Sequence, residues 1–119
     1  MELTNLMRIV QEQVPGKQVT LAHIIANPEP SLYQKMGLDM GVDPKKAAIG
    51  VLTVSPAEAA VIAADIASKS SGASLGVVDR CSGTLIITGT ISQVSAGFSA
   101  VCAYLQNTLG YTVCAMTQT

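Results

Sequence analysis

The sequence is short of charge and of aromatic side chains. Charged residues occupy 13% of its 119 positions and aromatic residues 3%, with no Trp and a single Phe, Phe98. An average soluble domain carries about 25% charged residues. A domain of this size leaves about a third of its surface in water, and so few charges cannot cover that surface densely. The shortage of charge therefore disfavours an isolated monomer and predicts that copies of the chain associate.

Long hydrophobic runs, basic clusters and paired cysteines are also missing. No apolar run reaches the roughly 20 residues of a bilayer span, and the first residues lack the basic and apolar regions of an export signal. The net charge of −1 argues against nucleic acid or an anionic membrane as partner. Cys81, Cys102 and Cys114 form no CxxC pair. Reduced thiols in the cytosol therefore fit better than a disulfide framework or an intrachain metal site.

What is present is an apolar chain, 49% hydrophobic with ten glycines, and its middle is patterned for a strand and a helix. Residues 46–53 form a β-rich run. Ser55-Pro56-Ala57-Glu58 follows as a capping box, with Ser55 at the N-cap. The helix is expected to run to Gly72, a plausible C′ glycine. Its many alanines would let it approach a sheet closely.

Within that predicted helix, the larger apolar residues and the charges are expected on different sides. Val61, Ile62 and Ile66 are predicted to belong to a broad apolar face. Asp65 and Lys69 stand four residues apart and are predicted to pair on the solvent side.

The second half continues as a hairpin, a helix and a closing strand. Residues 74–79 and 84–88 predict two strands joined by the glycine-bearing turn 80–83. Thr90 and Gln93 form a second capping box, which opens a helix over residues 91–109 with a buried stripe of Val94, Phe98, Val101, Cys102 and Leu105. Gly110 ends the helix, and residues 111–116 predict a strand. The order β-α-β-β-α-β is the ferredoxin-like arrangement of an α+β sandwich.

The N-terminal third has a different pattern. Residues 17–26 predict a strand, and residues 31–37 predict a short helix capped by Ser31. Residues 37–46 show no periodicity and predict a loop. Residues 6–14 fit a strand or a helix from pattern alone.

Four stretches of the sequence resemble one protein family. They are RIVQEQVPGKQVTLAHIIANP (8–28), AIGVLTVSPAEAAVIAADIASKS (48–70), LGVVDRCSGTLIITGTIS (75–92) and YTVCAMTQT (111–119). They are similar to circularly permuted, single-domain bacterial microcompartment (BMC) shell proteins. Members of that family belong to compartments that use propanediol or ethanolamine, including glycyl-radical propanediol compartments.

The resemblance implies homohexamers that tile edge to edge into the shell of a compartment in the cytoplasm. The permutation moves the usual last strand to the N-terminus, here near residues 18–26. It implies an N-terminal extension, residues 1–16, that contributes one strand to an axial β-barrel, which favours a strand for residues 6–14. The permuted BMC domain is then residues 17–119. Partners implied are copies of the chain, other BMC shell proteins and the tails of encapsulated enzymes.

The resemblance also implies roles for particular residues. Arg80, Cys81, Ser82 and Gly83 match the loop that lines or approaches the central pore of the hexamer. Lys69 matches the lysine at the edge between hexamers. Non-permuted members carry an edge arginine where this chain has Asn27, a departure that predicts weaker edge contacts or mixed sheets with other shell proteins.

Cys81 is a second departure, because close relatives carry an aromatic residue there. One interpretation is a plain pore-lining thiol in a turn. The other is a metal site, because six-fold symmetry would bring six thiols to one axis, and thiolates are the ligands of iron–sulfur clusters, zinc and copper(I). A [4Fe–4S] cluster has four ligand positions, so three or four of the six thiols would bind it.

For the other polar residues, a structural interpretation stands beside the functional one. Arg80 would form a positive ring that favours anions, or would pair with Asp79 or another subunit. Ser82 could offer its hydroxyl to solutes in the pore. His23, the only histidine, is expected to be a hydrogen-bonded structural residue, and Cys102 and Cys114 are expected to pack in the core.

The leading functional hypothesis is therefore a structural shell tile that is not an enzyme. A second hypothesis is a module that docks cargo through its N-terminal extension without a metal. A third is a small cytosolic ligand-binding oligomer of ferredoxin-like fold, which would need a pocket with convergent titratable groups.

Overall fold

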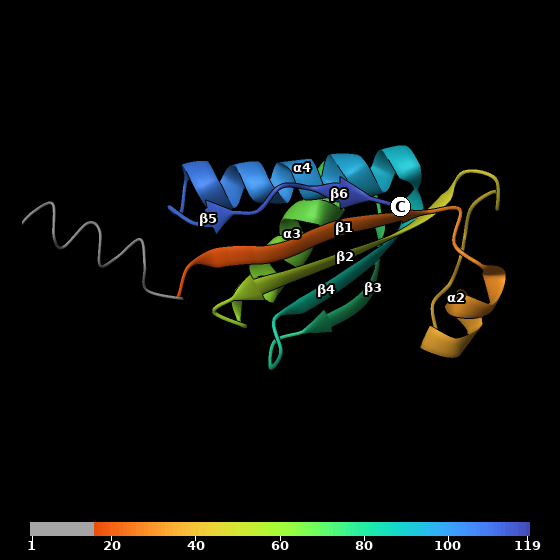
Figure 1. Ribbon diagram of the computed structural model, residues 1–119, viewed down its shortest axis with the longest axis horizontal. Helices are drawn as coiled ribbons and strands as arrows, with labels where there is room; N and C mark the ends of the chain where they lie inside the picture. Colours follow the sequence, from red (N-terminus) through yellow and green to blue (C-terminus); the bar gives the residue numbers. More distant parts are fainter. Residues whose placement is uncertain (1–15) are drawn as a thin grey trace, which may run out of the picture.

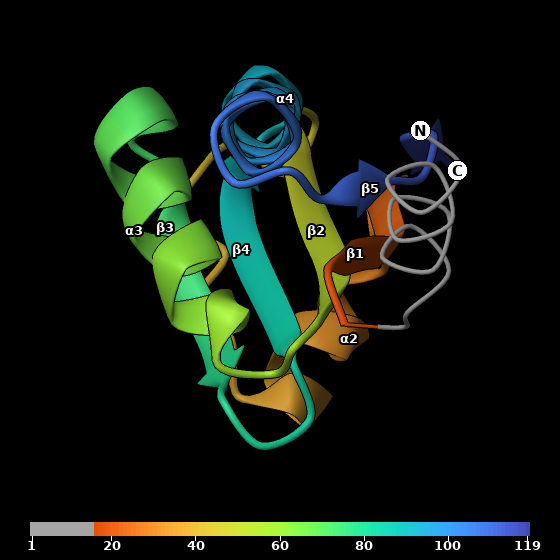
Figure 2. The ribbon, with the colours of Figure 1, turned by 90° about the vertical axis from the view of Figure 1, so that its left-hand side faces the viewer.

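The computed structural model describes residues 16–119, and the predicted extension of residues 1–16 lies outside that range except for Gly16. The elements in chain order are β1 (Gln18–Ala26), α2 (Pro30–Met36), β2 (Ala47–Ser55), α3 (Ala59–Ser71), β3 (Ser74–Asp79), β4 (Thr84–Thr90), α4 (Ile91–Asn107), β5 (Thr112–Val113) and β6 (Thr117–Gln118). Figure 1 shows α4 lying along the sheet and α2 beyond one end of it. Helices α3 and α4 cover one face, and α2 lies on the other side (Figure 2).

The sheet is antiparallel apart from its last two strands. Its order is β3-β4-β2-β1-β5, with β6 also paired to β1, and both β5 and β6 run parallel to β1. The strand predicted over residues 17–26 is confirmed as β1, and the predicted hairpin is confirmed as β3 and β4. From β2 onwards the chain follows the predicted β-α-β-β-α-β order, so the α+β fold is confirmed.

The C-terminal segment differs from the prediction. The single strand expected over residues 111–116 is replaced by β5 and β6, two residues each, with residues 114–116 in neither. A β-bulge between Val19 and Leu21 interrupts the register of β1. Because a bulge bends a strand and increases its local twist, the segment pairs with β1 before and after this point rather than continuously.

The packing of α3 depends on its alanines, and its larger residues lie elsewhere. Ala60, Ala63 and Ala67 are fully buried against the sheet and α4, whereas Val61 and Ile62 are 52% and 43% exposed. Of the broad apolar face predicted from Val61, Ile62 and Ile66, Ile66 packs against the core, whereas Val61 and Ile62 lie outside the buried face. Small side chains allow the helix to lie close to its neighbours, and this closeness leaves no room for the branched residues on that side.

Helix α4 packs on β2 at a similarly close distance. A Cβ atom built on Gly50 of β2 would lie 2.6 Å from Val94 Cγ1 and 2.7 Å from two ring atoms of Phe98, so the contact requires glycine. Cys102 is only half-buried at the margin of the core, which corrects its predicted place in the stripe. The fully buried residues of the stripe are Val94, Phe98, Val101 and Leu105.

The predicted capping box before α3 is wrong. Ser55 is still part of β2, where it pairs with Gln18, and the helix begins at Ala59 with Glu58 as N-cap and no side-chain cap. The backbone N–H groups of residues 59–61 donate instead to carbonyls three residues earlier. A turn of the backbone therefore satisfies the donors that a capping side chain would otherwise accept from.

The other two predicted helix starts have different outcomes. Ser31 is not a cap, because Pro30 takes the first helical position, for which its fixed φ is suited, and Glu29 becomes the N-cap. The box of Thr90 and Gln93 is confirmed: each side chain bonds the backbone of the other residue, at 3.1 and 3.0 Å. Helix α4 then ends at Asn107, two residues before the predicted end.

A second, smaller core lies under α2 on the opposite face of the sheet. Tyr33 is 3% exposed and packs with Ala47, Ile49 and Ile86. Its hydroxyl is buried without a hydrogen-bond partner among the described residues, and burial raises the pKa of Tyr33. An unpaired buried hydroxyl costs stability.

Replacing Tyr33 by Phe should therefore raise the free energy of unfolding by about 1 kcal/mol, because it removes the unpaired hydroxyl and keeps the ring. Urea unfolding measures the change. Tyr104→Phe, at a side chain that is 43% exposed, is the control and should change little. A loss of stability in Tyr33→Phe would show that the hydroxyl has a partner.

Candidate functional site

The turn between β3 and β4 contains the residues predicted to line a pore. At its start, Asp79 Oδ1 accepts hydrogen bonds from the backbone N–H groups of Cys81, at 2.8 Å, and Ser82, at 3.2 Å. The hydrogen bonds from Cys81 and Ser82 lower the pKa of Asp79 below its usual range. The carboxylate thus binds the backbone of the turn, a role that the sequence analysis missed, although an Asp at the first position of a turn is a known signal for it.

Three side chains of the turn are exposed. Arg80, Cys81 and Ser82 carry a cation, a thiol and a hydroxyl in succession. The Ser82 hydroxyl donates to Thr84 Oγ1 at 3.0 Å, so it is held beside the start of β4. The turn therefore presents an anion-binding group and a soft metal ligand next to each other on a fixed backbone.

Gly83 closes the turn against the end of β2. Its N–H donates to the Asp79 carbonyl at 2.9 Å, and its own carbonyl accepts from Val54 N–H at 2.8 Å. Its φ is +77°, and a Cβ atom there would lie 2.2 Å from the Val54 carbonyl oxygen. Both the backbone conformation and the contact with Val54 require glycine.

Gly83→Ala should therefore destabilise the chain much more than Gly110→Ala. Gly110 has nearly the same φ, +75°, but open space around its Cβ position. The change at Gly110 should cost about 1–2 kcal/mol from the backbone alone, and Gly83→Ala should add the cost of displacing Val54. Thermal and urea unfolding of the two variants measure the difference. Equal losses would show that the contact with β2 is unimportant.

A metal or cluster fits this turn only if several chains contribute. Within residues 16–119, no three His, Cys, Asp or Glu side chains gather to hold a metal ion. Cys102 and Cys114 are half-buried against the main core, and burial together with the nearby Cys114 raises the pKa of the Cys102 thiol. Cys81, in contrast, is exposed, and its thiol is the kind of donor that an iron–sulfur cluster needs.

Asn27 and Lys69, the predicted edge residues, lie far from the turn. Asn27 follows β1 with a φ of +50°, and its N–H donates to the Ala47 carbonyl at 2.9 Å. Lys69 lies in the last turn of α3 and pairs with Asp65 at 3.0 Å, as predicted, with both side chains more than half exposed. An exposed pair of this kind contributes little stability, so Lys69 is available for another contact.

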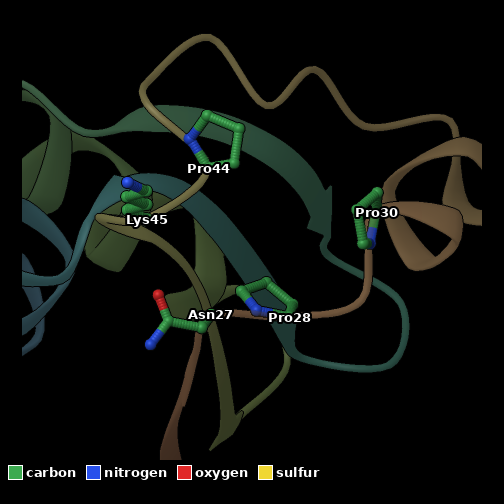
Figure 3. Close-up of a pocket in the computed structure, with 5 residues that line it drawn as sticks. All are labelled: Asn27, Pro28, Pro30, Pro44 and Lys45. Atoms are coloured by element: carbon green, nitrogen blue, oxygen red, sulfur yellow. The ribbon is translucent and has the colours of Figure 1, made fainter.

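A shallow, open depression borders Asn27. It is formed where the segment after β1 meets the end of the loop before β2, and Figure 3 shows Lys45 and Pro44 across from Asn27 and Pro28. Lys45 is the titratable side chain among its lining residues, which include no carboxylate, thiol or imidazole beside it. The lining residues are Asn27, Pro28, Pro30, Pro44 and Lys45.

The register of the sheet places the turn of residues 80–83 at one end and the predicted edge residues, Asn27 and Lys69, at the other. At one end, Gln18 pairs with Ser55 and Thr53 with Thr84, next to the turn of residues 80–83. At the other end, Ala26 pairs with Ala48, next to Asn27. The C-terminal end of α3, with Lys69, leads into β3 at this second end. A strand of nine residues, the length of β1, spans roughly 30 Å.

His23 has the structural role that was expected. Its Nδ1 lies 2.6 Å from Thr117 Oγ1 and its Nε2 lies 3.0 Å from Thr119 Oγ1. Both ring nitrogens are thus occupied by hydroxyls of the C-terminal segment. The sequence analysis identified the histidine but not its partners, because they are separated from it by 94 and 96 positions.

The sequence profile of the BMC domain matches residues 48–117, more than half of the chain. The chain belongs to the BMC domain family. In this BMC domain, β1 precedes the matched range and yet fills the sheet position next to β2. That is the order that the predicted circular permutation requires, and the resemblance of the sequence to BMC shell proteins is confirmed.

Known relatives of this BMC domain align over almost its whole length. Bacterial microcompartment shell protein PduU of Salmonella typhimurium (strain LT2) is 46% identical over 112 residues, which are 94% of this chain and 93% of that protein. A structure described as a CutR flat hexamer is 38% identical with a TM-score of 0.80, covering 92% of this chain and 96% of that one. A structure described as a CutR dimer with domain swap is also 38% identical, with a TM-score of 0.65, covering 87% and 100%.

The helices of residues 16–119 are short or only moderately apolar in relation to a lipid bilayer. None of them combines sufficient length with sufficient hydropathy to cross a bilayer.

Proposed function

We propose that this BMC domain is a structural shell protein that assembles with copies of itself into a flat hexameric tile of a bacterial microcompartment. The observation that carries the proposal is the placement of the exposed turn and the predicted edge residues at opposite ends of the sheet. In a ring of six copies, the turn then faces the axis while Asn27 and Lys69 face the perimeter. The relative described as a flat hexamer supports this assembly.

Exposed apolar side chains on α3 and β3 are available to be buried in contacts between subunits. Val61 and Ile62 project from α3, and Leu75 and Val78 of β3 are 46% and 39% exposed. Among the described strands, β3 is also an edge of the sheet and pairs with β4 alone, and edge strands of this kind are generally covered or paired in stable assemblies. Burying these residues between copies accounts for a chain with so little charge, since apolar burial stabilises by about 25 cal/mol per Å².

The same geometry supports a structural rather than a catalytic role. Both nitrogens of His23 are engaged in holding the C-terminal segment, and the depression beside Asn27 offers an amide and an ammonium group only. The relatives are named as shell proteins. The chain would therefore enclose chemistry performed by other proteins of the compartment.

At the perimeter, Lys69 would contact the neighbouring tile, and Asn27 would replace an edge arginine. Asn27 offers no charge, so the contact is weaker, and other BMC shell proteins would be partners in mixed sheets. If Lys69 merely pairs with Asp65, removing either side chain should have the same effect on the assembly of sheets. If Lys69 contacts the neighbouring tile, only its own removal matters.

Lys69→Ala should therefore leave hexamers intact and impair sheets, whereas Asp65→Asn should leave both unchanged. Native mass spectrometry measures the hexamer, and electron microscopy measures the extent of sheets. Equal sheets in wild type and Lys69→Ala would refute the edge role of Lys69. Absence of a hexamer in the wild-type protein would refute the tile itself.

At the axis, the exposed Arg80 side chains would form a positive ring that favours anionic solutes, with Ser82 beside them. We infer that the Cys81 thiols of three or four subunits hold a [4Fe–4S] cluster, since its four ligand positions cannot take six thiols. The exposure of Cys81 and the fixed backbone around it support this arrangement. When bound, such a cluster supplies one-electron transfer.

Anaerobic purification of the wild-type hexamer should give brown protein with roughly one cluster per six chains. Cys81→Ser should give colourless, iron-free hexamers, and Cys114→Ser is the control that should keep the colour. Visible absorbance and iron analysis measure the outcome. Colourless wild-type protein with a free Cys81 thiol would instead establish a plain pore-lining cysteine.

Cargo docking through residues 1–16 concerns a segment outside the described residues and stays a prediction. The small ligand-binding oligomer is disfavoured by the shallow, open form of the depression beside Asn27, since ligand sites are usually concave and enclosed.

A further inference from the structure

The C-terminal segment, Thr112–Thr119, lies along the outer edge of β1 and is attached at two places. Figure 1 shows β5 and β6 in dark blue beside β1. At the second attachment, Thr119 N–H donates to the Ile24 carbonyl at 2.9 Å, and Ala26 N–H donates to the Thr119 carbonyl at 3.0 Å. Each attachment includes a ladder of only two residues, which is short for an independent strand.

His23 reinforces the second attachment through its side chain. Its two ring nitrogens contact the hydroxyls of Thr117 and Thr119 at 2.6 and 3.0 Å. A hydroxyl can donate or accept a hydrogen bond, so it can pair with either tautomer of the ring. One residue of β1 therefore holds two of the last three residues of the chain, and we call this contact the clasp.

The first attachment is held by the backbone, where Thr112 N–H donates to the Lys17 carbonyl at 2.9 Å and Cys114 N–H donates to the Val19 carbonyl at 3.2 Å. The segment begins after Gly110, whose φ is +75° and whose surroundings are open, and Tyr111, which is buried. Met116, between the two attachments, is 41% exposed and belongs to neither strand. Residues 115–119 can thus leave β1 while the first attachment and the fully buried stripe of α4 stay in place.

We propose that the clasp sets the rate at which the C-terminal segment exchanges between β1 of its own chain and β1 of a second copy. This inference rests on the proposed function, because a hexamer holds neighbouring copies at high effective concentration. The β1 edge of each copy offers the same carbonyl, N–H and imidazole groups at the same register. Exchange of an identical element therefore preserves every contact and costs little.

The observation that favours a second copy over another partner is this exact match. The segment places Thr117 and Thr119 opposite His23 at a spacing that a different peptide would have to reproduce. The related CutR has been found as a dimer with domain swap, so an exchanged form exists within this fold. Because the segment must leave one clasp before it can form another, an intact clasp would make this exchange slow.

The first test measures release of the segment in the full-length protein. His23→Ala removes the clasp, and Thr117→Val with Thr119→Val removes its hydroxyls while keeping branched side chains. Amide hydrogen exchange of residues 115–119 should become about tenfold faster in both. Thr112→Val, on β5 and away from His23, is the control and should match the wild type. Unchanged exchange in His23→Ala would overturn the proposal.

The second test measures exchange between copies. Leu21→Cys and Met116→Cys are introduced together, since both side chains are exposed and stand two positions before His23 and one position before Thr117, which pair with each other. The natural cysteines are replaced by Ser, and a short bismaleimide links the two new thiols. When tagged and untagged hexamers are mixed, links between the two kinds of chain should accumulate slowly with His23 present. With His23→Ala, such links should accumulate about tenfold faster in denaturing gels.

The outcomes separate this inference from the proposed tile. Wild-type protein that is not hexameric by native mass spectrometry would refute the tile. A wild-type hexamer whose His23→Ala variant releases the segment but forms links within chains alone would refute the exchange and leave the tile standing.

Discussion

The pairing of β1 with β2 is the interaction on which the rest of the structure depends. It joins a strand from the start of the described chain to the strand at the centre of the sheet, over eight residue pairs from Gln18 to Ala26. Its register fixes which end of the sheet lies beside the turn of residues 80–83 and which lies beside Asn27. It also leaves the other edge of β1 free for the C-terminal segment. A slip of one residue would turn the buried Ala22 and Ile24 towards solvent.

The close packing of the helices on the sheet is related to the low charge of the surface. Alanines on α3 and Gly50 on β2 bring the helices near the sheet, so the core needs few large side chains and few aromatics. The larger apolar residues of α3 are then left on the outside, at Val61 and Ile62. A chain built in this way keeps part of its hydrophobic surface for contacts with other copies.

Much of this fold could be predicted from the sequence, and the exceptions have physical causes. Periodicity and the box of Thr90 and Gln93 identified β2 to α4 in the right order, because local patterns determine those elements. The box at Ser55 failed since β2 continues through that residue, and the sheet satisfies its backbone. The buried side of α3 was misjudged because volume, rather than hydrophobicity alone, decides which residues fit against a close sheet.

Of the candidate site, the parts that depend on local sequence were predicted, and the contacts between distant residues were not. The turn was recognised from Arg80 to Gly83, but the part played by Asp79 was missed. The partners of His23 could not be predicted, because sequence spacing carries no signal for contacts between β1 and the end of the chain. The proposed places of residues at an axis or a perimeter came from the resemblance, and the register of the sheet adds that the turn and Asn27 lie at opposite ends.

The fixed backbone of the turn has a consequence for how such proteins diversify. Asp79 and Gly83 determine its shape, while Arg80, Cys81 and Ser82 are exposed and contribute little to the core. Substitutions at these three exposed positions should therefore affect folding little. The cation, thiol and hydroxyl of the turn could therefore be replaced by other functional groups, in evolution or by design, while the fold of the tile is retained.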